Sequence, residues 1–391
     1  MGKIIGELKT NMDLWQLLLI EKCTGWIKVK EKRYEKFISE ITQIDSIENY
    51  SEFYDKMQRA LDEKQVLAST NYGAEATYYG YYDSLFEYAK MKKGRLVLIP
   101  SFEHGVRFGA PKWRYKNNSV CYACQGPKRV YEIHDVNPLK PVFVLGPYIH
   151  YAQYYYSVEK MQMLKQQFGK TLLVFPSHTC EDNQQSRNEK AFVDVVKDKY
   201  LSEYDTLLVC MYWNDINDPV VDAFKQIGGK IVSAGFRGDT NFIKRLKTLL
   251  YLADDVVVND IGTNIGFAYY MGCNVYLEAN KKQSADKVFQ QNYNIFEKAF
   301  YSPNKRFSVE QRELQEKLYN DYWGGQDFLL SQEDIKGILE TLQYVCAESK
   351  YSIKHIPIVM KQIICDGKNS NEQKKRRLSE IFKNSIAIKD N

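Results

Sequence analysis

The sequence has no hydrophobic run long enough to cross a membrane and no pattern typical of a secretion leader. The longest clean apolar run near its start is Leu17–Ile20, whereas a membrane-spanning helix needs about 20 apolar residues. No basic stretch followed by an apolar segment and a small-residue cleavage site is visible. We therefore expect a protein that neither spans a membrane nor is secreted.

Closely spaced cysteines are also scarce. The chain has 8 cysteines, and only Cys121 and Cys124 form a close pair. No second pair stands at the spacing of a zinc site, and a secreted disulfide scaffold would be shorter and denser in cysteine. We expect a cytoplasmic location and no metal ion held by these residues.

The chain carries no large excess of charge outside its last residues. The net charge is +5 over 391 residues, with 44% apolar and 26% charged residues, as in ordinary soluble globular proteins. Seven basic and three acidic residues between positions 367 and 391 leave +4 in that tail alone. The nearly neutral remainder predicts no nucleic-acid partner.

Several well-known catalytic and nucleotide-binding motifs are missing. No G-x-G-x-x-G follows a predicted strand, which argues against a dinucleotide-dependent dehydrogenase. The triplet Gly169-Lys170-Thr171 lacks the upstream glycine of a phosphate loop and precedes a strand rather than a helix. The absence of G-x-S-x-G disfavours an α/β-hydrolase, and the absence of D-x-D disfavours a metal-bridged diphosphate. We expect neither a metal nor a cofactor.

The first part of the chain alternates between helical and extended patterns. Apolar residues at helical spacing predict a helix within Arg33–Ala68, and a tyrosine-rich helix is expected over Tyr78–Lys90. Short apolar runs then predict strands at 95–100, 119–123 and 142–145, and Pro138, Pro141 and Pro147 suggest a domain edge.

From residue 157 onward, short strands alternate regularly with helices. The predicted strands are 171–175, 206–211, 230–234, 255–259 and 274–277, and the helices between them are 188–200, 219–227, 241–253 and 264–271. Such βαβ units build a parallel sheet covered by helices on both faces. We predict an α/β, Rossmann-like domain, followed by further helices over residues 284–363.

Loops at the carboxyl ends of parallel strands are where such sheets bind ligands. The most informative loop runs from Asn259 to Asn264, between a strand and a helix. Gly262 permits a tight turn, Thr263 or Asn264 can cap the next helix, and the helix start could hold a phosphate. The alternative is a well-capped structural helix.

Two further strand-end loops carry groups that suit a nucleotide. His178, next to Ser177, could donate to a phosphate or to nucleotide hydroxyls, although a lone histidine is more often structural. Arg237 has the planar guanidinium that matches a phosphate, and a surface ion pair is the competing interpretation.

A fourth loop, Glu103-His104-Gly105, follows the strand predicted at 95–100. A histidine with a near-neutral pKa suits a general base that deprotonates a hydroxyl. Glu103 is the competing candidate for that role, and Gly105 would let a substrate approach the backbone closely.

Together these loops resemble the GT-B class of nucleotide-sugar glycosyltransferases over residues 94 to 280. The sequence PSHT at 176–179 resembles the histidine loop, and NDIGTN at 259–264 the phosphate loop, of bacterial sialyltransferase-like and capsule-polymer transferases. Two departures stand out. Thr179 replaces the usual proline after the histidine, and GFAYYMG at 266–272 lacks the glutamate that often binds ribose, which leaves that role to Glu278.

The resemblance implies two Rossmann-like domains facing a cleft, with additional N- and C-terminal helices. The implied divisions are an acceptor-side domain at 1–150, a nucleotide-sugar-binding domain at 151–345 and a helical extension with a basic tail at 346–391. His178, Thr263 and Asn264 would bind the donor, a CMP- or UDP-sugar, and His104 would be the acceptor-side base. The implied activity is sugar transfer to an acceptor hydroxyl in bacterial surface polysaccharide biosynthesis.

The tail adds one expectation about location. Leu378, Ile381, Phe382 and Ser385 fall at helical spacing beside the basic run 374–377, which is typical of a peripheral membrane segment. We expect a glycan or lipid-linked acceptor at the inner face of the cell membrane; the alternative is a solvated, disordered tail.

Two other functions stay open, namely a nucleotide-sugar epimerase and an inactive glycan- or partner-binding module.

Overall fold

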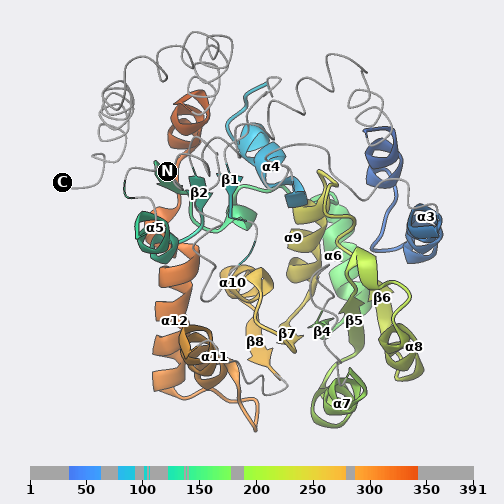
Figure 1. The fold of residues 1–391 in the computed structure, drawn as a ribbon. Coiled ribbons are helices and arrows are strands. Elements are labelled where there is room, and N and C mark those ends of the chain that lie inside the picture. Colours follow the sequence, from blue (N-terminus) through green and yellow to red (C-terminus); the bar gives the residue numbers. More distant parts are fainter. Residues whose placement is uncertain are drawn as a thin grey trace, which may run out of the picture.

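The computed structural model describes residues 35–62, 78–92, 101–103, 105, 122–135, 138, 141–177, 189–278 and 287–341. These residues form an α/β protein with two separate sheets, both of them entirely parallel. Figure 1 shows the smaller sheet beside α4 and α5 and the larger one beside α6, α9 and α10. The predicted α/β, Rossmann-like class is therefore confirmed.

The smaller sheet has three strands in the order β1-β2-β3. They are β1 (Ser101–Phe102), β2 (Tyr122–Cys124) and β3 (Val142–Val144). Alternate residues of β2 point to opposite faces, so Tyr122 and Cys124 pack with Ile133 of α5 (Pro127–His134), whereas Ala123 joins the main core. Sequence patterns did not predict α5, which begins with a proline in its first turn, a position that proline tolerates.

The larger sheet has five strands in the order β6-β5-β4-β7-β8. They are β4 (Thr171–Phe175), β5 (Thr206–Cys210), β6 (Lys230–Val232), β7 (Asp255–Val258) and β8 (Asn274–Leu277). The helices are α6 (Val158–Phe168), α7 (Glu189–Val195), α8 (Pro219–Gln226), α9 (Phe242–Leu252) and α10 (Thr263–Tyr270). A π-helical turn, Val196–Tyr200, extends α7. All five strands and the predicted helices, counting the π-helical turn with α7, lie within one or two residues of their expected bounds.

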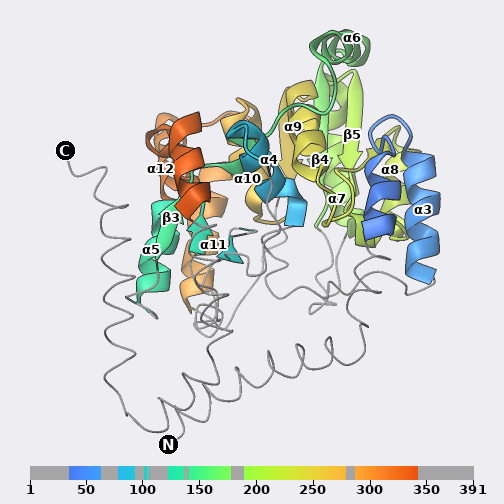
Figure 2. The same ribbon diagram turned by 90° about the horizontal axis from the view of Figure 1, so that it is seen from above.

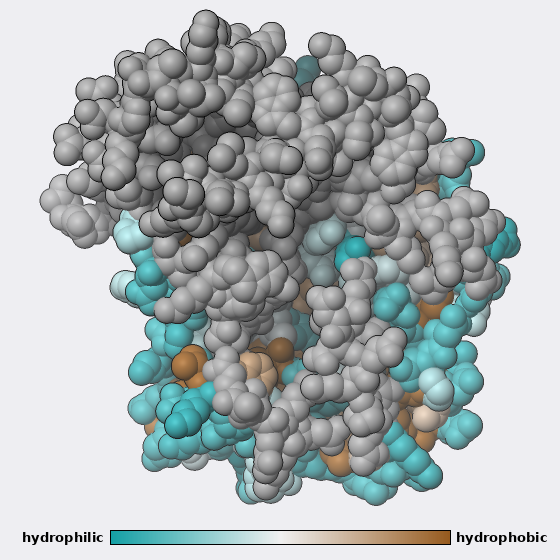
Figure 3. Space-filling model, viewed as in Figure 1, coloured by the Kyte–Doolittle hydropathy of each residue, from teal (hydrophilic) through white to brown (hydrophobic). Residues whose placement is uncertain are grey.

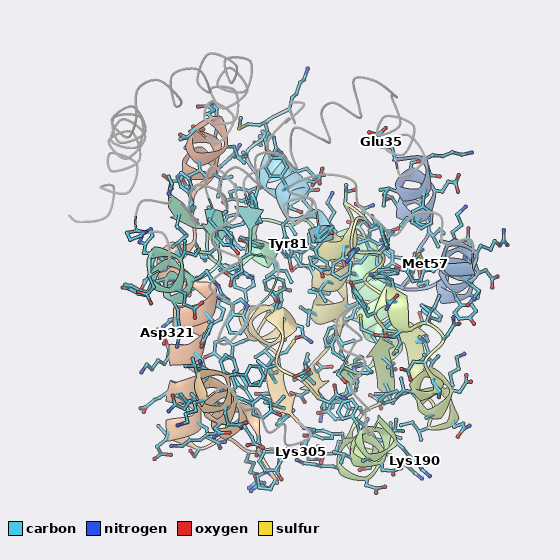
Figure 4. All side chains as sticks on the ribbon, viewed as in Figure 1. Glu35, Met57, Tyr81, Lys190, Lys305 and Asp321 are labelled. Carbon is cyan, nitrogen blue, oxygen red and sulfur yellow. The ribbon has the colours of Figure 1, made fainter. Side chains whose placement is uncertain are left out.

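Both faces of this sheet are buried. Val257 packs with Phe192 of α7 and Phe224 of α8, while Val256 and Leu249 of α9 lie in the core on the other side. Burial on both faces explains why these strands read as continuous apolar runs rather than as alternating ones. The core that contains Val256 and Leu249 also contains residues of the small sheet, so the two sheets share one hydrophobic cluster. Figure 4 shows Tyr81 of α4 (Tyr81–Tyr88) between them.

The N-terminal helices pack against the larger sheet. Residues 35–42 form one helix and α3 (Tyr50–Asp62) another, instead of the single helix predicted over Arg33–Ala68. The chain turns between them, where the Asp45 carboxylate accepts hydrogen bonds from two backbone N–H groups, as in an Asx turn. Phe37 contacts Phe236, beyond β6, edge to face. Arg245 forms a fully buried ion pair with Asp239. It also donates a hydrogen bond to Ile44 O at 2.8 Å, which connects this turn to α9.

The C-terminal helices reach back to the small sheet. They are α11 (Lys287–Phe300), α12 (Val309–Trp323) and a helix over residues 332–341. Figures 1 and 2 show α12 running along one side of the molecule toward α5. A Cβ atom at Gly126, which precedes α5, would lie 2.4 Å from the Tyr322 backbone. At the same end of α12, the Trp323 ring would lie 2.1 Å from a Cβ atom at Gly266 in α10. The C-terminal end of α12 therefore contacts both the start of α5, beside the small sheet, and α10, beside the larger sheet.

The described surface is mainly hydrophilic where Figure 3 leaves it visible, with small separate hydrophobic spots. No helix among the described residues is long and apolar enough to cross a membrane. The basic tail predicted to contact a membrane lies outside the described residues, as does His104.

Candidate functional site

The strand order of the larger sheet defines a topological switch point between β4 and β7. From β4 the chain proceeds to β5 and β6 on one side, and it then returns to β7 and β8 on the other. Ligands of such sheets bind where the two directions part, beyond the carboxyl ends of the strands. β4 ends at Phe175, two residues before Ser177, and β7 ends at Val258, directly before the 259–264 loop. The sequence therefore brings two of its four candidate loops to one place.

The start of α10 lies at this switch point. Gly262 is its N-cap residue and has an extended backbone (φ −147°, ψ 177°), so Thr263 is the first residue of the helix. Its backbone angles do not call for glycine, and a Cβ atom there would lie 2.8 Å from Asn264 Oδ1, so a larger residue would have to displace that side chain. Gly262 has no side chain to cap the helix, and the backbone N–H groups of a helix start favour an anion.

The loop of the small sheet approaches the same helix start. A Cβ atom at Gly105 would lie 3.4 Å from Thr263 Oγ1. Gly105 follows β1 at its carboxyl end, and Thr263 follows β7 at the carboxyl end of the other sheet. Strand-end loops of the two sheets therefore meet at this contact, which is the central geometric feature of the candidate site.

Glu103 is held in a buried network. Its carboxylate accepts a hydrogen bond from Arg129 Nε at 2.8 Å and one from the backbone N–H of Gln125 at 3.0 Å. The side chains of Glu103 and Arg129 are 3% and 4% exposed, and Arg129 also pairs with Glu132. These contacts connect Glu103 to the end of β2 and to the start of α5.

Arg237 and Glu278 lie at the two edges of the larger sheet, beyond β6 and β8. The Arg237 guanidinium is 4.9 Å from the centre of the Tyr78 ring and 5.8 Å from that of Trp213. β6 is two strands away from β4, roughly 10 Å. Glu278 pairs with Lys199 and accepts from Tyr200 Oη at 2.6 Å. Both side chains are thus engaged with neighbouring elements at a distance from the switch point.

Of the remaining predicted residues, Ser177, Gly262, Thr263 and Asn264 are all partly exposed at the switch point. His104 and His178 lie outside the described residues. Their described neighbours, Gly105 and Ser177, are the residues that connect each histidine to the site. The assignments of base and donor-binding histidine stay predictions.

Other titratable groups close to Glu103 are unsuited to proton transfer near neutral pH. Burial raises the pKa of Tyr81 and of Tyr148 well above its ordinary value, and the nearby charge of Glu103 contributes in the same direction. The same two causes raise the pKa of the Cys124 thiol. All three groups therefore stay protonated in the pH range where a general base must accept a proton.

Sequence reasoning missed two buried amide side chains at the strand ends. Gln125 follows β2 and is fully buried, and neither Nε2 nor Oε1 has a hydrogen-bond partner within the structure described. Asn259 follows β7 and is 4% exposed, and its Oδ1 likewise has no partner there. Buried amides are usually paired. Their only sequence signal was a polar residue directly after an apolar strand.

Among the described residues, no group of three or more His, Cys, Asp or Glu side chains could hold a metal ion. No protein-family model matches this chain, and no curated protein matches its sequence.

Proposed function

We propose that this chain is a glycosyltransferase, which moves a sugar from a nucleotide-sugar donor to an acceptor hydroxyl in bacterial surface polysaccharide biosynthesis. One observation carries the proposal. The start of α10, at the switch point of the larger sheet, meets the Glu103–Gly105 loop of the smaller sheet through the approach of Gly105 to Thr263. An anion-binding helix start beside a second strand-end loop suits a reaction between a phosphorylated donor and a separate acceptor. The two sheets would then correspond to the two domains of a GT-B enzyme.

Sugar transfer needs an acceptor hydroxyl, a base that takes its proton, and groups that stabilise the departing phosphate. The bond between the sugar carbon and the donor phosphate breaks, and a bond from the acceptor oxygen to that carbon forms. The acceptor proton passes to a base, for which we propose His104. The departing phosphate takes up negative charge, which the N–H groups of α10 after Gly262, with Ser177 and His178, would stabilise without a metal ion.

Glu103 is the weaker of the two candidate bases. Its carboxylate already accepts from Arg129 and from the Gln125 backbone, and a base must instead reach the acceptor proton. We propose that Glu103 supports the loop that carries His104. Glu278 would contribute to donor binding only if it gave up its present contact with Lys199, and Arg237 only if it gave up its contact with Tyr78.

The acceptor and the location remain parts of the proposal. A glycan or lipid-linked acceptor at the inner face of the cell membrane is compatible with the basic tail after residue 366. The resemblance of PSHT and NDIGTN to sialyltransferase-like and capsule-polymer transferases supports a CMP- or UDP-sugar as donor.

The first test is nucleotide binding. Thermal unfolding is measured with CMP, CDP, UDP and GDP, and a nucleotide present at 100 times its Kd should stabilise the protein by about 2.7 kcal/mol. For a chain of 391 residues that corresponds to a rise in Tm of about 3 °C. An unchanged Tm with all four nucleotides and their sugar conjugates would contradict the proposed function.

Variants then separate the two sides of the site. His178→Ala should weaken nucleotide binding, and His104→Ala should abolish transfer while leaving nucleotide binding intact. His134→Ala is the matched control, because His134 is the last residue of α5, whereas that helix contacts Glu103 through Arg129 near its start. Full transfer activity in His104→Ala would remove the histidine from the role of base.

A further inference from the structure

The buried Gln125 side chain lacks, among the described residues, the hydrogen bonds that a buried amide normally makes. It is fully buried, yet within the described structure neither its Nε2 nor its Oε1 makes a hydrogen bond. A buried polar group without a partner destabilises the folded state. A neutral amide with both a donor and an acceptor free is also what a binding site needs for a ligand group that both accepts and donates.

The backbone around Gln125 is rigidly fixed. Its N–H donates to Glu103 at 3.0 Å, and its carbonyl oxygen accepts from Gly146 N at 3.0 Å. The same carbonyl oxygen would lie 2.7 Å from a Cβ atom at Gly324. A side chain that projects from such a support is held in place before a ligand arrives, which favours precise binding.

Gln125 belongs to the junction where the candidate site lies. Its partner Glu103 stands two residues before Gly105, which approaches Thr263. Its other neighbour, Gly324, follows Trp323, whose ring covers Gly266 in α10. In β2, Cys124 faces α5 and Ala123 faces the shared core. Gln125 follows this strand at its carboxyl end, the end at which Glu103 follows the neighbouring parallel strand β1.

A second amide at the other sheet supports this interpretation. Asn259 directly follows β7, three residues before Gly262, and its buried Oδ1 also has no partner within the described residues. Gln125, at the carboxyl edge of the small sheet, and Asn259, at that of the larger sheet, thus each have a buried amide atom that these residues leave without a hydrogen bond. Because the two observations come from different sheets, a local packing fault in one of them does not explain both.

We propose that the Gln125 carboxamide is a substrate-binding group of this site, and that it binds a neutral hydroxyl or acetamido group on the sugar of the donor. The inference rests on the proposed function. The helix start at α10 would bind the charged phosphate, whereas the amide, which has both a donor and an acceptor, can pair with a hydroxyl or acetamido group that also has both. Gln125 would therefore select the sugar and would leave nucleotide affinity almost unchanged.

The test compares two dissociation constants in each of several variants, one for the free nucleotide and one for its sugar conjugate. If UDP is the nucleotide that binds, the probes are UDP, UDP-glucose and UDP-N-acetylglucosamine; if it is CMP, they are CMP and CMP-N-acetylneuraminate. Gln125→Met keeps the length of the side chain and removes the amide. It should weaken sugar-conjugate binding about 10- to 100-fold and leave free-nucleotide binding within about twofold of the wild-type value.

Tyr319→Phe is the matched control, because Tyr319 in α12 also carries a buried hydroxyl without a partner in the described part of the chain. Both variants remove an unpaired polar group, so both should raise the Tm of the free protein by about 1–3 °C. Only Gln125→Met should change the ratio of the two dissociation constants. A purely structural glutamine would raise or lower Tm without changing that ratio.

The outcomes separate the two proposals. An unchanged ratio in Gln125→Met overturns the inference and leaves the proposed function intact, whereas wild-type protein that binds no nucleotide or sugar conjugate overturns both. If Gln125→Met does not fold, Gln125→Asn, which withdraws the amide by one methylene, takes its place with the same expected ratio. If neither variant folds, the amide serves the fold itself and the inference is wrong.

Discussion

Replacing Glu103 by glutamine tests whether this residue supports the fold or performs chemistry. The change keeps the shape of the side chain and an acceptor oxygen for the Gln125 N–H, but it removes the charge that faces Arg129 at 2.8 Å. Both partners of the pair are almost fully buried. Removing one member of such a pair leaves an uncompensated buried charge, which typically costs 3–5 kcal/mol of stability.

The magnitude is reduced in part by Glu132, the second carboxylate on Arg129. Glu132 is a poorer partner, since burial raises its pKa. We therefore expect a loss of about 3 kcal/mol. With an unfolding entropy of about 0.8 kcal/mol/K for 391 residues, the Tm should fall by about 4 °C.

The assay is thermal unfolding of Glu103→Gln beside a matched variant, Glu203→Gln. Glu203 pairs with Lys305 but is 48% exposed, so its loss should change Tm very little. Figure 4 shows Lys305 at the lower end of the molecule, far from Tyr81. If Glu103→Gln kept the wild-type Tm but lost sugar transfer, Glu103 would be a catalytic group and the structural interpretation would be wrong.

Two further predictions concern packing and protonation. Gly266→Ala should lower the free energy of unfolding by about 1–3 kcal/mol, because its Cβ would collide with the Trp323 ring. Exposed Gly337, in the helix at 332–341, has no atom within 4 Å of a Cβ, so Gly337→Ala should instead raise the free energy of unfolding by about 0.5–1 kcal/mol. Chemical denaturation measures both, and equal effects would refute the contact. Burial lowers the pKa of Lys247 from 10.5 to about 8, so the unfolded chain binds its proton up to a higher pH than the folded one, and stability should rise with pH between these values. From pH 7 to 9 the wild type should gain about 1 kcal/mol relative to Lys247→Met; parallel curves for the two proteins would contradict this.

The larger sheet could be predicted from sequence because its strands are buried on both faces. Runs such as residues 171–175 and 255–258 are short, apolar and followed by a polar turn, and the helices between them carry capping residues. Asp218, for example, accepts from Val220 N as the N-cap of α8. Local signals were therefore sufficient for element type and order.

The smaller sheet and the contacts between distant segments could not be predicted in this way. β2 is three residues long, and α5 shows a polar surface with few apolar positions. The break before α3 depends on a carboxylate that binds the backbone locally, which competes with helical periodicity. At the site, the pattern predicted which loops follow strands, but the order of the strands in the sheet was not predicted, and the ion pair of Glu103 with Arg129 joins residues 26 positions apart.

The position of α12 has a consequence for how the chain folds during synthesis. The small sheet is complete by Val144, yet its surroundings include Tyr322 beside Gly126 and Gly324 beside Gln125. About 180 residues must therefore be translated before the first sheet meets its last neighbours, roughly ten to forty seconds at ordinary elongation rates. During that interval the surface at Gly126 and Gln125 that α12 later covers is exposed, so we expect the nascent chain to depend on chaperones until α12 has left the ribosome.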